Sequence, residues 1–129
     1  SHRIGFHAVD MLSPAALPGE ADVWWMSQFL DCFSPDQIVA MLTRVAQVMK
    51  PGARLCIMEL FWDAQKFEAA SFSLNATSLD FTCMANGNSR CYSVEAFYRY
   101  LESAGFSVEQ RLDNLGVGPT LLICTKREQ

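Results

Sequence analysis

The feature that most constrains the fold is a strong helix signal between two apolar runs. Ser34 supplies a capping hydroxyl, Pro35 occupies the first helical position and Gln37 the third, which is typical of a helix start. A Lys-Pro-Gly sequence at 50–52 ends the segment. Between these points apolar side chains recur at helical spacing: Ile38, Met41, Leu42, Val45, Val48 and Met49.

Apolar runs flank this helix on both sides. The first covers 23–26 and continues to Phe29 and Leu30, and the second covers 54–62 with Glu59 inside it. Runs that do not alternate with polar residues are typical of strands covered on both faces. Strand, helix and strand together predict a βαβ unit, whose crossover should be right-handed.

The rest of the chain predicts further helices and strands around this unit. We expect a short strand over 5–9, a helix with weaker periodicity over 67–81, and a helix that Ser93 caps and Gly105 ends. The stretches 107–112 and 120–125 predict an antiparallel pair at the edge of the sheet. The expected fold class is α/β, with helices on both faces of a sheet.

Length and charge restrict the function classes. A chain of 129 residues suits one domain, here 1–129. Its 10 Lys and Arg against 14 Asp and Glu argue against nucleic acid or an anionic membrane as the main partner. No apolar run approaches the ~20 residues of a membrane-spanning helix, and the N-terminus lacks a signal-peptide pattern. We therefore expect a soluble protein.

The cysteines indicate neither a disulfide scaffold nor a metal site. They are odd in number, widely spread and without a CxxC pair, and both histidines lie near the N-terminus, away from them. We expect no metal, and a reducing cytoplasm as the compartment. The five are Cys32, Cys56, Cys83, Cys91 and Cys124.

Acidic residues follow three of the predicted strands. Asp10, Asp31 and Glu59 each lie at or just after the C-terminal end of one. Ligands bind at that edge of open parallel sheets, so the three carboxylates could share a cleft, or each could cap a loop or stay solvated. Glu59 is the most informative, because a carboxylate among apolar neighbours needs a partner or a raised pKa.

Several stretches, taken in order, resemble the small-molecule O-methyltransferase family of the class I S-adenosylmethionine-dependent methyltransferases. Their order and spacing carry the resemblance rather than any single motif. It implies a Rossmann-like methyltransferase sheet that is incomplete, made of the later strands and a C-terminal antiparallel hairpin. The stretches are Val9–Leu12, Ala21–Met26, Phe29–Ser34, Lys50–Arg54 with Met58-Glu59, Ser93–Phe106 and the final strand from Thr120.

The resemblance implies roles for individual residues. Asp10 and Met11 match the pair that contacts the adenine end of the cofactor, S-adenosyl-L-methionine, and Ser27 stands where many members have a lysine near it. Asp31 stands where the family places the histidine that takes the proton from the acceptor hydroxyl. Glu59 matches a glutamate that orients this histidine. An aspartate with a pKa of ~3.9 is a poor general base unless its surroundings shift that pKa strongly.

The resemblance also extends to the acceptor side. Asn86 matches an asparagine that contacts the substrate, and Cys91 stands where a second glutamate usually lies. The segment 72–81, which carries a single charge at Asp80, predicts an apolar or aromatic acceptor pocket together with Phe61, Trp62 and Met84.

Two parts that the family uses to hold its cofactor do not occur in this sequence. One is the glycine-rich loop after the first strand, since Gly87 and the pair Gly116 and Gly118 do not lead from a parallel strand into a helix. The other is the acidic residue that ends the second strand. The family's N-terminal helical domain is missing too. We therefore expect the C-terminal half of a methyltransferase catalytic domain, inactive by itself.

The resulting hypothesis is methyl transfer to a hydroxyl of a small acceptor, performed as part of a longer chain. The alternative is a methyltransferase-like binding or interaction module without catalysis. The departures from the family at Asp31 and Cys91 favour this module, whereas the matches at Asp10 and Glu59 favour the enzyme. A third possibility is an unrelated α/β domain. The central strand that would lie beside 22–29 belongs to the missing half, so 22–29 should have an apolar open edge. This edge predicts a homodimer or contact with the missing N-terminal half.

Overall fold

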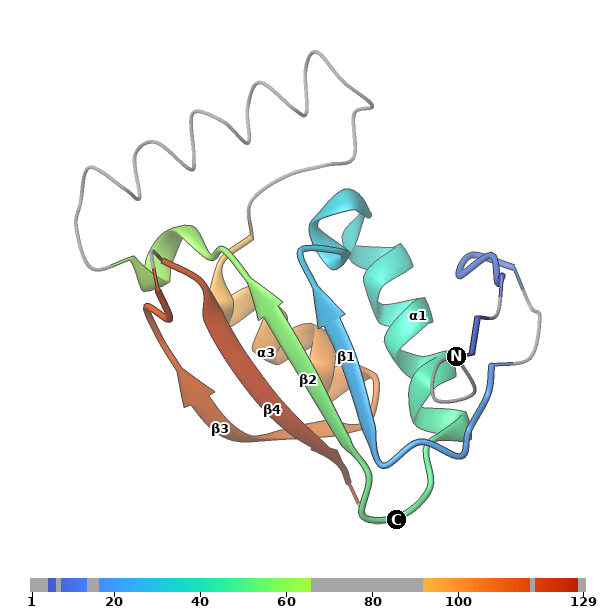
Figure 1. Cartoon of the computed structure of the whole chain (residues 1–129). Helices are drawn as coiled ribbons and strands as arrows, with labels where there is room; N and C mark the ends of the chain where they lie inside the picture. Colours follow the sequence, from blue (N-terminus) through green and yellow to red (C-terminus); the bar gives the residue numbers. More distant parts are fainter. Residues whose placement is uncertain (1–4, 7, 14–16, 66–91, 117, 128–129) are drawn as a thin grey trace.

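The computed structural model describes residues 5–6, 8–13, 17–65, 92–116 and 118–127. The helix expected over 67–81, the substrate-contacting Asn86, and Cys83 and Cys91 all lie outside the described residues. Figure 1 shows the elements in chain order. They are β1 (Val23–Ser27), the 3-10 helix η1 (Leu30–Cys32), α1 (Pro35–Val48), β2 (Arg54–Glu59), the 3-10 helix η2 (Trp62–Ala64), α3 (Val94–Ser103), β3 (Phe106–Leu112) and β4 (Thr120–Lys126).

The four strands form one mixed sheet in the order β1-β2-β4-β3. β1 runs parallel to β2, with Val23 opposite Arg54 and Ser27 opposite Met58. β4 is antiparallel to both β2 and β3, and the β3–β4 pairing has an irregularity between Val108 and Gln110. The structure therefore confirms the parallel β1–α1–β2 unit and the C-terminal antiparallel pair.

Both long helices begin where their capping residues predict. Ser34 accepts a hydrogen bond from the Gln37 backbone N–H (3.3 Å), and the Gln37 side chain accepts one from the Ser34 N–H (3.0 Å), which completes a capping box. Ser93 likewise accepts from the N–H of Ala96 (3.0 Å) at the start of α3. Gly105 follows α3 with a φ of +95°, a left-handed conformation that glycine adopts without strain.

The core lies between the sheet and its two long helices. In Figure 1, α1 and α3 lie on the same side of the sheet. Apolar side chains from both helices and from the central strands are buried there and together hold the sheet in place. The fully buried ones include Ile38, Leu42, Leu55, Ile57, Phe97, Leu101 and Leu122.

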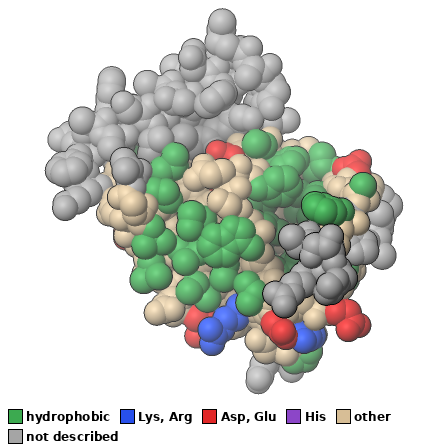
Figure 2. Space-filling view, in the orientation of Figure 1, with side chains coloured by type: hydrophobic (Ala, Val, Ile, Leu, Met, Phe, Trp, Pro, Cys, Tyr) green, Lys and Arg blue, Asp and Glu red, His purple; other side chains and the backbone are tan. Residues whose placement is uncertain are grey.

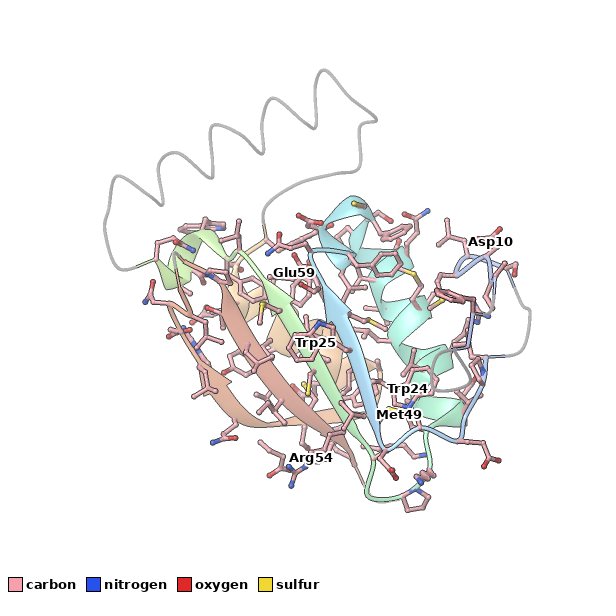
Figure 3. All side chains as sticks on the ribbon, in the orientation of Figure 1. Asp10, Trp24, Trp25, Met49, Arg54 and Glu59 are labelled. Carbon is pink, nitrogen blue, oxygen red and sulfur yellow. The ribbon has the colours of Figure 1, made fainter. Side chains whose placement is uncertain are left out.

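The opposite face of the sheet is open among the described residues. Val23 and Trp25 of β1 are 56% and 55% exposed, so the expectation that the first apolar run is covered on both faces is wrong for these residues. Figure 2 shows hydrophobic side chains gathered over this face, and Figure 3 shows Trp25 in front of the strands. Whether helices cover both faces stays a prediction, because 67–81 is not described.

Two expectations about strands are also wrong: one strand does not form, and another ends earlier than expected. Gly5, Phe6, Ala8 and Val9 do not form a strand, and Phe6 is 92% exposed. A strand needs a neighbour for its backbone hydrogen bonds, and none of the described ladders includes these residues. The second apolar run leaves the sheet at Glu59 and turns into η2, because apolar composition alone does not mark where a ladder ends.

No helix within the described ranges is long and apolar enough to cross a membrane.

Candidate active site

Glu59, the last residue of β2, lies at the edge where the parallel strands β1 and β2 both end. Its side chain is only 1% exposed. Its Oε1 accepts hydrogen bonds from the backbone N–H groups of Phe29 (2.9 Å) and Leu30 (3.0 Å). Figure 3 shows Glu59 beside the end of β1. The carboxylate of one strand thus holds the loop that follows its neighbour.

A sharp turn after β1 brings that loop to Glu59. Gln28 has a φ of 52°, a left-handed conformation that is uncommon for a residue other than glycine. Its N–H donates to the carbonyl oxygen of Met58 (2.9 Å), which extends the parallel pairing by one bond. The chain then forms η1, which carries Asp31.

Asp31 is half-buried on η1 and lies close enough to Glu59 to affect its ionisation. Burial raises the pKa of Asp31, while the Cys32 thiol and a backbone N–H stabilise the carboxylate and partly lower it. The thiol donates to Asp31 Oδ1 at 3.7 Å. The structure therefore brings together the two residues predicted to be catalytic.

Glu59 has the more perturbed carboxyl group. Burial, and after it the negative charge of Asp31, raise its pKa from 4.5 to about 7, against the lowering effect of hydrogen bonds from the backbone N–H groups of Phe29, Leu30 and Asp31. Its second oxygen, Oε2, is buried without a hydrogen-bond partner among the described residues. Because of burial and of the repulsion between the two neighbouring carboxylates, the pair loses its last proton only near neutral pH.

Asp10 and Met11, two of the three predicted cofactor residues, lie away from this pair (Figure 3). Asp10 is exposed and closes its own turn, accepting from the N–H of Leu12 (2.9 Å) and the hydroxyl of Ser13 (2.8 Å). The carbonyl of Met11 accepts from the Arg44 side chain, which fastens this turn to α1. Figure 3 shows Asp10 beyond α1, apart from Glu59. The three acidic residues therefore do not form one cluster, because no strand over 5–9 brings Asp10 to the sheet edge.

Ser27 ends β1 on the open face of the sheet. Because side chains alternate along a strand, Ser27 shares that face with Trp25 and Met58, while Glu59 shares the other with Ile57. Ser27 is exposed at the same edge as Glu59 but approaches it from the opposite face.

Tyr92 also contacts the loop, although no sequence pattern identifies it. Its hydroxyl donates to the carbonyl oxygen of Phe33 at 2.5 Å. The two residues are 59 positions apart, so only the folded chain brings them together.

A groove of about 1020 Å³ at the other end of the sheet does not belong to this site. It lies between the C-terminal ends of α1 and α3, and its lining includes Lys126 and Arg127. These cations already donate to the carbonyl oxygens of Met49 (2.8 Å) and Glu102 (2.5 Å). The groove thus offers no uncommitted charge that we can assign to a ligand.

The described residues offer no metal centre. Nowhere in these ranges do three His, Cys, Asp or Glu side chains gather closely enough to hold an ion. Cys56 and Cys124 are free thiols. Burial raises the pKa of Cys124 to about 12, which leaves it an unreactive core residue.

Comparison with known proteins agrees with the fold. The profile of the O-methyltransferase domain family matches residues 1–107. The mitomycin biosynthesis 6-O-methyltransferase of Streptomyces lavendulae is 29% identical over 111 residues, which are 86% of this chain and 30% of that protein. The probable inactive O-methyltransferase 11 of Dictyostelium discoideum is 26% identical over 91 residues, 70% of this chain and 26% of that protein.

Solved structures share the same fold. TnmH has a TM-score of 0.81 at 20% identity, with 98% of this chain and 36% of TnmH covered. Human N-acetylserotonin methyltransferase, solved in complex with S-adenosylmethionine, has a TM-score of 0.78 at 20% identity, with 99% of this chain and 35% of that enzyme covered. This chain spans about 30% of the length of the mitomycin relative. With most of its residues matched by the family profile, the chain belongs to the O-methyltransferase domain family.

Proposed function

We propose that this chain supplies the proton-accepting part of an S-adenosylmethionine-dependent O-methyltransferase that acts on a small acceptor. The observation that carries the proposal is the pair Asp31 and Glu59 at the edge where β1 and β2 end. Ligands of open α/β sheets bind at this edge. Two coupled carboxyl groups with raised pKa values are typical of a site that moves protons.

The pair would accept the proton that the acceptor hydroxyl loses. S-Adenosylmethionine, when bound, supplies an electrophilic methyl group. Asp31 is the more exposed of the two carboxyl groups, so it would face the acceptor oxygen. Glu59 would hold η1 through Oε1 and keep its own proton up to about pH 7, while burial makes Asp31 a stronger base than an exposed aspartate. Asp31 would take the proton of the acceptor O–H as the acceptor oxygen receives the methyl group. The bond between that methyl group and the sulfonium sulfur would break, and S-adenosylhomocysteine would leave.

The chain would hold only part of the cofactor. Asp10 is exposed, and its Oδ1 accepts from the N–H of Leu12. Its second carboxylate oxygen, Oδ2, would therefore accept a hydrogen bond from the adenine end of the cofactor. Met11 would line the same end, and Ser27 is exposed at the end of β1. These residues fit the edges of a cofactor site. The glycine-rich loop expected for its centre does not occur in this sequence, so we propose that this chain alone binds the cofactor weakly or not at all.

We propose an apolar or aromatic acceptor. Trp62, in η2 directly after β2, is 37% exposed near the same edge and could contact a ring. The segment 72–81 and Asn86 would complete this pocket, on the resemblance stated above.

A second candidate function is a binding or interaction module without catalysis. Asp31 stands in place of the expected histidine, and a relative from Dictyostelium discoideum is named a probable inactive O-methyltransferase. In that case the pair would be structural, and substitution of Asp31 would leave binding intact.

We also propose that β1 meets a partner, either a second copy of this chain or the remainder of a longer one. Its edge has no neighbouring strand among the described residues, and the side chains of Val23 and Trp25 on β1 are exposed. A reducing cytoplasmic compartment is proposed from the free thiols Cys56 and Cys124.

The test is Asp31→Asn in the full-length protein, assayed with radiolabelled S-adenosylmethionine and a panel of phenols. We expect kcat to fall by about 10²- to 10⁴-fold, the usual contribution of general base catalysis. Asp36→Asn, an exposed carboxylate in the first turn of α1, is the matched control. A methylation rate unchanged by Asp31→Asn would exclude Asp31 from the reaction and favour the binding module.

Isothermal calorimetry with S-adenosylhomocysteine tests the cofactor proposal. We expect weak or no binding to the 129-residue chain. Micromolar affinity for a monomer of this chain would refute it.

A further inference from the structure

Tyr92 is buried at the junction of three elements near the proposed site. Tyr92 is 6% exposed. The centroid of its ring lies 5.5 Å from the ring centroid of Phe97 and 5.9 Å from that of Tyr100, and both of these residues are on α3. Its backbone carbonyl accepts from the N–H of Trp62 in η2 (3.3 Å). Figure 1 shows the chain entering α3 beside η2. The ring is therefore fixed by rigid elements rather than by the loop it contacts.

The hydroxyl of Tyr92 reaches from this junction to the loop of Asp31. It donates to the carbonyl oxygen of Phe33 at 2.5 Å. Phe33 is the C-cap residue that follows η1. Its own N–H donates to the Leu30 carbonyl (3.1 Å) across the turn that contains Asp31. A bond to Phe33 therefore fixes the exit of that turn.

The entry of the same turn is fixed from the other side. Glu59 Oε1 accepts from the N–H groups of Phe29 and Leu30. Asp31 thus lies between two anchors, a carboxylate on β2 and a phenol hydroxyl just before α3. A loop held at both ends can present its side chain in one geometry, which general base catalysis requires.

We propose that Tyr92 is a positioning residue, which holds the exit of η1 through Phe33 so that Asp31 keeps its place beside Glu59. The inference rests on the proposed function only for the role of Asp31. The anchoring itself is a property of this chain and can be tested without any methyl transfer.

Tyr92→Phe is the direct test, because it removes the hydroxyl and keeps the ring against α3. The measurement is amide hydrogen exchange by NMR in the full-length protein, read at residues 29–33 and across β2 and β4. Exchange should become about five- to tenfold faster at 29–33, the size expected for the loss of one buried hydrogen bond, and stay unchanged in the strands. Tyr100→Phe is the matched control, since Tyr100 contacts the same ring and no described hydrogen bond joins it to η1.

Two results would overturn the proposal. One is unchanged exchange at 29–33 in Tyr92→Phe. The other is equal acceleration in β2 and β4, which would mean that the hydroxyl contributes only to overall stability.

The rate of methyl transfer distinguishes the anchoring by Tyr92 from the proton-accepting role of Asp31. With an active full-length enzyme, Tyr92→Phe should lower kcat by about five- to tenfold and leave the KM for S-adenosylmethionine unchanged, since Asp31 acts on the acceptor. Faster exchange confined to 29–33 with an unchanged kcat would support the anchoring by Tyr92 and refute the proton-accepting role of Asp31.

Discussion

Glu59→Gln should change the way in which stability depends on pH. The folded protein holds the Glu59 proton up to about pH 7, whereas the unfolded chain releases it near pH 4.5. Between these values the folded state binds more protons, so the free energy of unfolding falls as pH rises. At 1.36 kcal/mol per pH unit, this decrease amounts to about 3 kcal/mol. Glutamine does not ionise, and its amide oxygen can still accept from Phe29 and Leu30.

Urea unfolding at pH 5 and pH 9 measures the effect. The variant and the wild type should have similar stability at pH 5, and the variant should be more stable at pH 9 by about 3 kcal/mol. Glu102→Gln, at an exposed position on α3, controls for the loss of a surface charge. A stability difference that stays constant between pH 5 and pH 9 would refute the assignment of a buried, protonated Glu59.

Three further predictions concern single side chains, and a fourth concerns the carboxyl pair. Ser34→Ala removes the capping box of α1 and should lower the free energy of unfolding by about 1 kcal/mol in urea. Gly105→Ala should cost about 1 kcal/mol in the same assay, because alanine is strained at a φ of +95° and no neighbouring atom would clash with its Cβ. Trp25→Lys should reduce self-association in analytical ultracentrifugation and leave the melting temperature nearly unchanged, because this side chain is exposed. In the full-length enzyme, kcat/KM should rise with pH and level off above about 7, as the pair loses its last proton, and a flat profile between pH 5 and pH 9 would contradict this.

The sequence predicts the β1–α1–β2 unit well because its signals are local. The capping box of Ser34 and Gln37, the helical spacing and the Lys-Pro-Gly stop all act within a few residues of one another. The exposed face of β1 could not be predicted, because an apolar run does not say whether anything covers it. Trp25 lies in a run with the apolar composition of a buried strand, yet it is 55% exposed.

The candidate site was predictable in part for the same reason. Asp31 and Glu59 come together because both follow parallel neighbouring strands, a relation that the βαβ pattern already contains. Asp10 does not join them, since that would need a strand over 5–9 with a partner. Tyr92 could not be found at all, because its bond to Phe33 depends on tertiary packing across 59 positions.

The choice of glutamate at position 59 bears on the two candidate functions. A structural anchor for η1 needs only an oxygen that accepts from Phe29 and Leu30, and a glutamine amide provides one without ionisation. Glutamate adds an ionisation that lowers stability as pH rises from 4.5 to about 7, and it leaves Oε2 buried without a partner among the described residues. A binding module gains nothing from that cost. An enzyme that must take a proton near neutral pH does gain from it, because a carboxyl group with a pKa of about 7 is matched to that task. On this physical ground the carboxyl pair favours catalysis over a purely structural role.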